Sequence, residues 1–145
     1  MSNSDFTVPD ICDAHGDKIA IGDIFLTSYG GIEKFFGEIR TVDCPHSNSV
    51  VKELVQENGE GKVLVINHSG DKLCSMVGDQ IAQKAYENNW KGIFVNGYIR
   101  DIEVIKNISI GVCAKNVFPM KTDKAVGVGT KDTSFKIGSV EIRSG

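Results

Sequence analysis

The chain has little of what marks membrane, secreted or nucleic-acid-binding proteins. Its longest apolar runs, residues 63–66 and 92–95, are far shorter than the roughly 20 residues that span a bilayer. Residues 1–10 have neither the basic start nor the apolar stretch of a secretory signal. The 16 basic residues are outnumbered by 19 acidic ones and no basic arm is present, which gives a nucleic-acid partner no electrostatic support. We therefore expect a soluble, cytoplasmic protein with no nucleic-acid or membrane partner.

Closely spaced cysteines are also missing. Cys12, Cys44, Cys74 and Cys113 include no C-x-x-C pair, and no cysteine and histidine stand at zinc-finger spacing. Reduced, partly buried thiols are therefore expected. Cys74 has no evident base partner in the sequence, so we expect no nucleophilic role for it.

The residues that are present are typical of a globular protein. The chain has 145 residues and a mass of 15.7 kDa, with 41% hydrophobic and 24% charged residues, and a chain of this size buries about 68–70% of its unfolded surface. It contains 16 glycines but only three prolines, which favours tight turns and close backbone approaches over flexible linkers. No repeat or linker is visible, so we expect a single domain over residues 1–145.

The spacing of apolar residues predicts helices that alternate with strands in the middle of the chain. In residues 50–55 the apolar positions lie one, three and four apart, as one face of a helix requires. Residues 62–66 form a Val/Leu/Ile run typical of a strand covered on both faces. Similar patterns predict helices over residues 7–16, 47–58, 79–89 and 102–105, strands over 24–26, 35–42, 62–66, 93–96 and 108–114, and a hairpin over 135–142. This order indicates an α/β fold with a mixed sheet.

Two of the predicted buried strands end in polar loops, at residues 67–70 and 97–101. In an open α/β sheet, ligands bind beyond the carboxyl ends of the strands, so both loops belong to one candidate site. The first loop leads to Gly78 and Asp79, at the start of a predicted helix. The N–H groups at such a start have no intrahelical partner and favour an anion.

Four residues at these loops suit chemistry on a 2-oxo acid. Gly78 lets the backbone approach a ligand closely, and Asp79 is either a helix cap or an acid at the mouth of the site. Arg100 offers a fork of donors to a carboxylate or an enolate oxygen, and Asp101 can hold a hard divalent cation. The residues alone leave a second interpretation open, in which Arg100-Asp101 is a solvated surface pair and Gly78-Asp79 is only a cap.

Gly78-Asp79, followed after twenty intervening residues by Arg100-Asp101, resembles the D-x20-R-D signature of the class II pyruvate aldolases. The chain is also similar to the regulator of ribonuclease activity A (RraA) family over nearly its whole length. That similarity lies in residues 10–13, 35–42, 57–65, 89–92 and 96–101. The resemblance implies a single-domain β/β/α swivelling-domain-like fold, with a mixed sheet and flanking helices.

The resemblance also implies a role for each site residue. The backbone amides of Gly78, Asp79, Gln80 and Ile81 would bind the carboxylate of pyruvate, and Asp79 would position a metal-bound or catalytic water. Arg100 would bind the substrate and stabilise its enolate, and Asp101 would ligate Mg²⁺ or Mn²⁺. The implied reaction is cleavage of 4-hydroxy-4-methyl-2-oxoglutarate-type acids to pyruvate, with oxaloacetate decarboxylation as a side activity. A homotrimer, or a hexamer of two trimers, would place the sites between subunits.

Two other functions remain to be weighed against the aldolase. The ribonuclease regulators share the fold, and a non-catalytic protein of that kind would bind and inhibit an endoribonuclease. Asp101 favours the aldolase, because some regulators lack the acid after the arginine. A methyltransferase is set aside, since no glycine-rich S-adenosylmethionine loop follows a first strand.

Two residues near the first loop have open roles. His68 either contacts the substrate or packs within the loop. Leu73 stands where the resemblance leads us to expect an arginine, and Lys72 is the neighbouring cation that would compensate.

Overall fold

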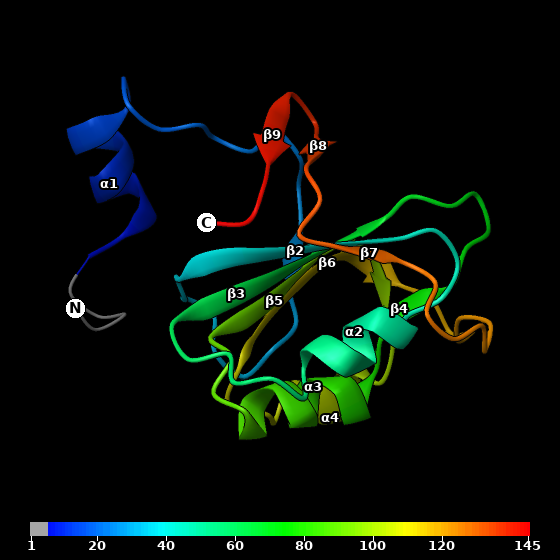
Figure 1. The fold of residues 1–145 in the computed structure, drawn as a ribbon. Coiled ribbons are helices and arrows are strands. Elements are labelled where there is room, and N and C mark those ends of the chain that lie inside the picture. The colour runs from blue at the N-terminus through cyan, green and yellow to red at the C-terminus, as the bar shows by residue number, and fades with distance from the viewer. Residues whose placement is uncertain (1–5) are drawn as a thin grey trace.

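The computed structural model describes residues 6–145 (Figure 1). The helices of this part are α1 (Val8–His15), α2 (Ser49–Leu54), α3 (Asp79–Glu87) and α4 (Ile102–Ile105). Its strands are β1 (Thr27–Ser28), β2 (Glu38–Cys44), β3 (Lys62–His68), β4 (Ser75–Val77), β5 (Gly92–Ile99), β6 (Gly111–Val117), β7 (Thr130–Lys131), β8 (Phe135–Ile137) and β9 (Val140–Ile142). The predicted mixed α/β fold is confirmed.

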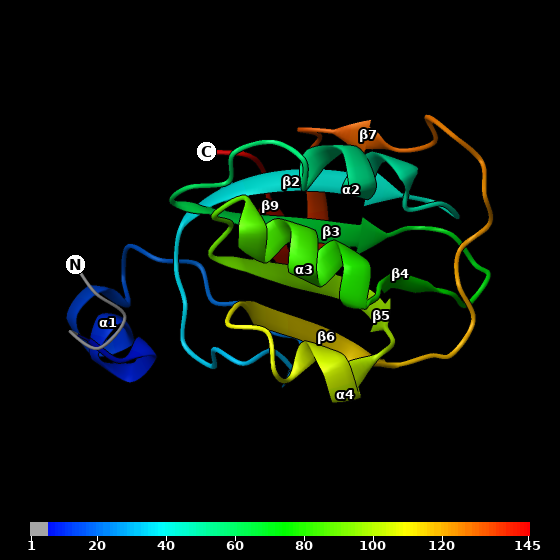
Figure 2. The ribbon, with the colours of Figure 1, turned by 90° about the horizontal axis from the view of Figure 1, so that it is seen from below.

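Seven strands form one mixed sheet in the order β1-β6-β5-β3-β2-β7, with β4 added beside the end of β5. The central strands β2, β3, β5 and β6 are parallel, whereas β1 and β7 pair antiparallel at the two edges. The carboxyl ends of the four parallel strands therefore lie at the same end of the sheet. The segment between β6 and β7 runs past these carboxyl ends, from the β6 side of the sheet to the β7 side (Figure 2).

The sheet is covered by different elements on its two faces. Helices α2, α3 and α4 lie on one face, and the β8–β9 hairpin lies on the other (Figure 1). Along β3, Leu64 and Ile66 belong to the large core under the helices, whereas Val63 and Val65 belong to a smaller cluster under the hairpin. The uninterrupted apolar run of β3 follows from this double coverage.

The predicted helix starts are partly confirmed. Helix α1 forms within the predicted range 7–16, and Thr7 caps it in a capping box with Asp10. Helix α2 begins after Asn48, but the Asn48 side chain makes no capping bond; the Ser49 N–H donates to Ser47 Oγ instead. Helix α2 ends at Leu54, earlier than predicted, while α4 has the predicted bounds.

Several predicted strands are displaced or wrong. Residues 24–26 are not a strand, because the edge strand there is β1, which pairs with β6 through Thr27 and Ala114. The strand predicted from residue 108 starts at Gly111, since the turns after α4 continue to Ile110. Residues 97–99 extend β5 and are not loop. Strands β4 and β7 were not predicted, because a strand of two or three residues is too short to show an alternation of apolar and polar residues.

Within residues 6–145, no helix has the length and apolar character needed to cross a membrane.

The ring of Phe35 lies against the backbone of two adjacent strands. Gly92 of β5 and Gly111 of β6 are partners in the sheet register. A Cβ atom at Gly92 would lie 2.3 Å from the Phe35 ring, and one at Gly111 would lie 2.1 Å from it. These glycines therefore leave room for an aromatic ring on the hairpin face of the sheet.

We expect Gly111→Ala to lower the free energy of unfolding by about 1–3 kcal/mol, because the new methyl group overpacks against Phe35. Urea denaturation would measure the change. Gly22→Ala is the matched control, since a Cβ there meets nothing within 4 Å. In a Phe35→Ala background the Gly111 substitution should cost much less, and an unchanged cost would contradict this explanation.

Candidate active site

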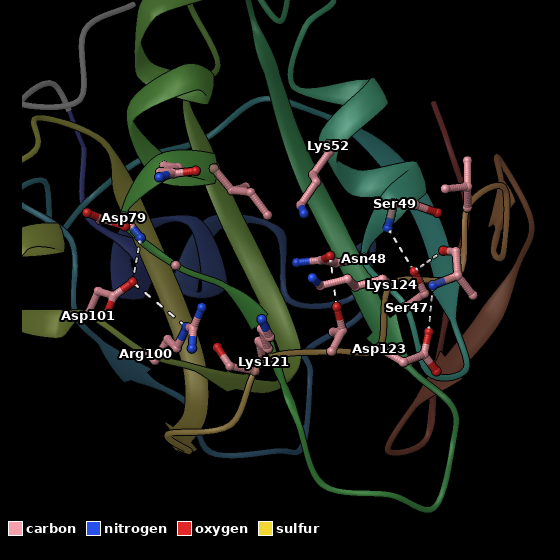
Figure 3. Close-up of a pocket in the computed structure, with 17 residues that line it drawn as sticks. Ser47, Asn48, Ser49, Lys52, Asp79, Arg100, Asp101, Lys121, Asp123 and Lys124 are labelled. Atoms are coloured by element: carbon pink, nitrogen blue, oxygen red, sulfur yellow. Dashed lines mark hydrogen bonds and ion pairs between the residues drawn. The ribbon is translucent and has the colours of Figure 1, made fainter.

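A pocket of about 470 Å³ opens at the carboxyl ends of the parallel strands. Its walls come from the start of α2, the start of α3, the turn between β5 and α4, and the segment after β6 (Figure 3). The lining residues are Ser47, Asn48, Ser49, Lys52, Ser75, Gly78, Asp79, Gln80, Ile81, Arg100, Asp101, Lys121, Thr122, Asp123, Lys124, Ala125 and Val126. The six residues given roles in the sequence analysis, Gly78, Asp79, Gln80, Ile81, Arg100 and Asp101, all line this pocket, whereas the loop at residues 67–70, which was expected at the same site, does not.

Asp101 joins the turn after β5 to the start of α3. Asp101 directly precedes α4 and has a left-handed backbone, with φ of 60°. Aspartate tolerates this conformation better than most residues. Its Oδ2 accepts a hydrogen bond of 3.1 Å from the N–H of Asp79, the first residue of α3. The Arg100 N–H donates to Val77 O of β4 at 3.0 Å. The turn after β5 is therefore fixed against the start of α3.

Gly78 is required by the position of the Asp101 carboxylate. A Cβ atom on residue 78 would lie 2.7 Å from Asp101 Oδ2. Real Cβ atoms do not approach an oxygen so closely, so any side chain here would push the carboxylate away from the helix start. The close backbone approach expected at Gly78 is thus made by Asp101 of the same chain.

The Arg100 guanidinium lies beside the same carboxylate. Its Nε is 4.0 Å from Asp101 Oδ2, and its Nη1 donates to Pro119 O at 3.3 Å. The side chain is 39% exposed, which leaves further N–H donors turned to the pocket. A planar fork held in this way can bind a carboxylate or stabilise an enolate oxygen.

The start of α3 offers fewer free amides than expected from the sequence. The Asp79 N–H is engaged by Asp101, whereas the N–H groups of Gln80 and Ile81 have no partner within residues 6–145. The Asp79 carboxylate also has no hydrogen bond or ion pair in that part of the chain. Two amides and one carboxylate at this end are thus without a partner within residues 6–145.

Asp101 fits a divalent metal that keeps most of its water. One carboxylate oxygen is bonded to the Asp79 N–H and the other has no partner among the described residues. No group of three or more His, Cys, Asp or Glu side chains within residues 6–145 could form a complete protein cage. Mg²⁺ is often held by one or two carboxylates plus water and substrate, whereas a structural zinc needs four protein ligands.

The opposite wall of the pocket was missed by the sequence analysis. Asn48 donates to Met76 O at 2.9 Å and accepts at 2.9 Å from Thr122 Oγ1, a hydroxyl on a buried side chain. Ser47 Oγ donates to Ala125 O at 2.6 Å. These bonds hold residues 121–126 over the site. The sequence did contain a signal for this wall. Three residues that commonly cap helices, Ser47, Asn48 and Ser49, stand together at the start of α2, but only the Ser47 side chain bonds to the helix backbone, through the Ser49 N–H.

The charged groups of this wall are three lysines and one acid. Lys52, Lys121 and Lys124 line the pocket, as does Asp123. Asp123 accepts from the Ala125 N–H at 2.9 Å and lies 2.5 Å from His46 Nδ1. The Ala125 N–H and then His46 hold the pKa of Asp123 below its usual value. Asp123 is therefore ionised at neutral pH, and its oxygens already have partners.

Neither of the two open residues near the first loop lies at the site. His68 does not line the pocket, and its Nε2 is 3.7 Å from Cys74 Sγ. Burial lowers the pKa of His68 and raises that of the Cys74 thiol, so both stay neutral at pH 7. Leu73 and Lys72 do not line the pocket either. Packing is therefore the role that the structure gives to His68.

The structure is an α/β fold with a pocket at the carboxyl ends of the parallel central strands of its mixed sheet. A family model described as "RraA-like: Aldolase/RraA" matches residues 8–145. The chain belongs to this RraA-like family.

Two relatives in bacteria carry the name "Putative 4-hydroxy-4-methyl-2-oxoglutarate aldolase". The protein of Marinomonas sp. (strain MWYL1) is 41% identical over 138 residues, which cover 95% of this chain and 85% of the relative. The protein of Pseudomonas aeruginosa (strain LESB58) is 40% identical over 140 residues, which cover 97% of this chain and 86% of the relative.

Two solved structures are similar over 97% of this chain. One is described as the RNA-processing inhibitor RraA from Thermus thermophilis, with a TM-score of 0.89, 30% identity and 85% of its own chain covered. The other is described as an S-adenosylmethionine:2-dimethylmenaquinone methyltransferase from Geobacillus kaustophilus HTA426, with a TM-score of 0.92, 34% identity and 86% covered.

We expect Thr122→Val to release the segment that forms the second wall. The substitution removes the bond to Asn48 and leaves the amide oxygen of Asn48 without that donor, at a cost of about 1–2 kcal/mol. Hydrogen exchange of peptides covering residues 119–128 should become faster. Thr130→Val is the control, because Thr130 is exposed and its hydroxyl makes no hydrogen bond within residues 6–145. Equal exchange in both variants would contradict the role of Thr122.

Proposed function

We propose that this protein is a divalent-metal-dependent class II aldolase. It would cleave 4-hydroxy-2-oxo acids of the 4-hydroxy-4-methyl-2-oxoglutarate type to pyruvate, and would decarboxylate oxaloacetate as a side activity. The observation that carries the proposal is the contact of Asp101 with the start of α3, beside the Arg100 guanidinium. The names of the relatives support the same reaction class.

The cleavage needs no redox partner. The C3–C4 bond breaks, and its electron pair moves to C3 and the C2 oxygen as an enolate. The C4 hydroxyl loses its proton and becomes the carbonyl of the second product. The enolate then takes up a proton at C3 and gives pyruvate. In oxaloacetate the same bond breaks with loss of CO₂.

The residues of the chain have separate tasks in this scheme. The free N–H groups of Gln80 and Ile81, at the positive end of α3, bind the C1 carboxylate. The Arg100 guanidinium stabilises the negative charge that develops on the C2 oxygen. The Asp79 carboxylate, which has no protein partner in residues 6–145, holds the water that carries protons to and from the substrate.

Mg²⁺ or Mn²⁺, held by the Asp101 carboxylate, supplies Lewis-acid polarisation of the 2-oxo group when bound. Arg100 and the Asp79 N–H orient that carboxylate from two sides.

We expect Asp101→Ala to lower metal-dependent pyruvate release by about 100-fold or more, because it removes the carboxylate proposed to hold the metal beside Arg100. Pyruvate would be measured with lactate dehydrogenase and NADH, after treatment with EDTA and again after addition of MgCl₂ or MnCl₂. Glu103→Ala, a nearby exposed acid outside the pocket, is the control and should keep full activity.

A non-catalytic regulator is the second candidate, supported by the structural similarity to the RNA-processing inhibitor RraA. A wild-type protein that releases no pyruvate with either metal would contradict the aldolase. Retention of an endoribonuclease in a pull-down, unchanged by Arg100→Ala, would then support the regulator.

We also propose a homotrimer, alone or as a hexamer of two trimers. Helix α1 has no buried residue and lies apart from the sheet (Figure 1). An isolated helix of eight residues is not stable in water, so α1 needs a surface to pack on. A cleft of about 600 Å³ with a largely apolar lining, under the hairpin, and the 97% exposed side chain of Phe25 also favour a neighbouring subunit.

Light scattering after size exclusion should give a mass of three or six times the 15.7 kDa of the chain at micromolar concentration. The monomer mass under these conditions would contradict the assembly.

A further inference from the structure

The second wall of the pocket carries positive charge that the proposed cleavage does not use. Lys52 comes from α2, and Lys121 and Lys124 come from the segment after β6. None of the three makes an ion pair or hydrogen bond within residues 6–145. The neighbouring acid on α2, Glu53, pairs with Lys131 at 3.2 Å and leaves Lys52 without a partner.

The acids of the pocket do not neutralise these lysines. Asp101 is bonded to the start of α3 and lies beside Arg100. Asp123 is taken by His46 and the Ala125 N–H. In Figure 3 the Asp79 side chain lies at the α3 end of the pocket, away from Lys52 and Lys124. Unpaired ammonium groups in a cleft concentrate anions from solution.

Two of the lysines lie at the end of the pocket opposite the reacting groups. Figure 3 shows Lys52 and Lys124 beside Asn48 on the α2 side, whereas Arg100 and Asp101 lie on the α3 side. The chain on both sides of Lys124 is held in place, because Thr122 is bonded to Asn48 and Ala125 to the buried Ser47, while the Lys124 side chain itself is exposed. The cations are thus built into the wall on two separate elements.

We propose that Lys52 and Lys124 bind the distal carboxylate of the substrate and so select 2-oxo acids with a second carboxylate. This inference rests on the proposed aldolase function, which places the C1 carboxylate at the start of α3. A substrate held there extends its far end toward the α2 side of the pocket. Monocarboxylic 4-hydroxy-2-oxo acids leave the two ammonium groups unpaired and are poorer substrates.

Binding and cleavage would be measured together on the wild type and on Lys52→Met, Lys124→Met and the double variant. Methionine keeps the length of the side chain and removes its charge. Calorimetry with Mg²⁺, at constant ionic strength and without phosphate, compares the binding affinities of 2-oxoglutarate and pyruvate. 2-Oxoglutarate has a second carboxylate but no C4 hydroxyl, so it binds without being cleaved. Pyruvate release compares 4-hydroxy-4-methyl-2-oxoglutarate with 4-hydroxy-2-oxopentanoate, which lacks the second carboxylate.

We expect each single variant to weaken 2-oxoglutarate binding about 5-fold and the double variant about 20-fold, as for partly exposed charge pairs, with pyruvate binding changed by less than about 2-fold. The kcat/KM for the diacid should fall by the same factors relative to the monoacid. Lys136→Met, an exposed lysine of β8 outside the pocket, is the control and should change neither ratio.

The outcomes separate this inference from the proposed function. An active enzyme whose two ratios do not change in the double variant would overturn the role of the lysines alone. A wild type that binds 2-oxoglutarate no better than pyruvate would overturn it as well. A wild type that discriminates between the two ligands but cleaves neither hydroxy acid would overturn the aldolase and leave the anion subsite.

Discussion

The hydrogen bond from the Asp79 N–H to Asp101 Oδ2 is the contact on which the candidate site depends. It joins the start of α3 to the start of α4, two elements that follow different parallel strands. Without it, the acid after β5 would be a solvated side chain on an exposed turn. With it, the acid is held where the helix dipole and Arg100 both favour a carboxylate. The parallel sheet supplies the proximity, and this one bond supplies the orientation.

The pocket divides its charges between two ends. At the α3 end, Arg100 lies beside Asp101 and Asp101 is bonded to a backbone amide, while the Asp79 carboxylate has no partner within residues 6–145. In the proposed function this end binds the metal and the reacting 2-oxo group. At the α2 end, Lys52 and Lys124 have no ion pair within residues 6–145, which suits the proposed recognition of an anion that takes no part in bond cleavage. The polar contacts of Asn48 and Ser47 keep the second end in place, and they do so with side chains that would otherwise cap a helix.

The α3 end could be predicted from the sequence because each of its residues lies next to a strongly patterned element. The run of residues 62–66, the apolar face of α3 and the position of Arg100-Asp101 after a buried strand together fix which loops meet. The α2 end could not be predicted in this way. Lys124 lies in a segment that shows no helical or strand pattern, and it reaches the pocket only because that segment crosses over the strand ends (Figure 2). Edge strands of two or three residues, such as β1 and β7, were missed for the same reason.

Because the backbone of Asp101 is left-handed, the residues that its turn accepts and the residue that the proposed chemistry needs can be considered separately. Aspartate and asparagine are the side-chain-bearing residues that adopt this conformation most readily, and glycine adopts it freely. Replacement of Asp101 by asparagine or glycine would remove the carboxylate and keep the turn and the sheet. If the proposed function holds, a single substitution at this position would therefore abolish the chemistry without changing how the chain folds.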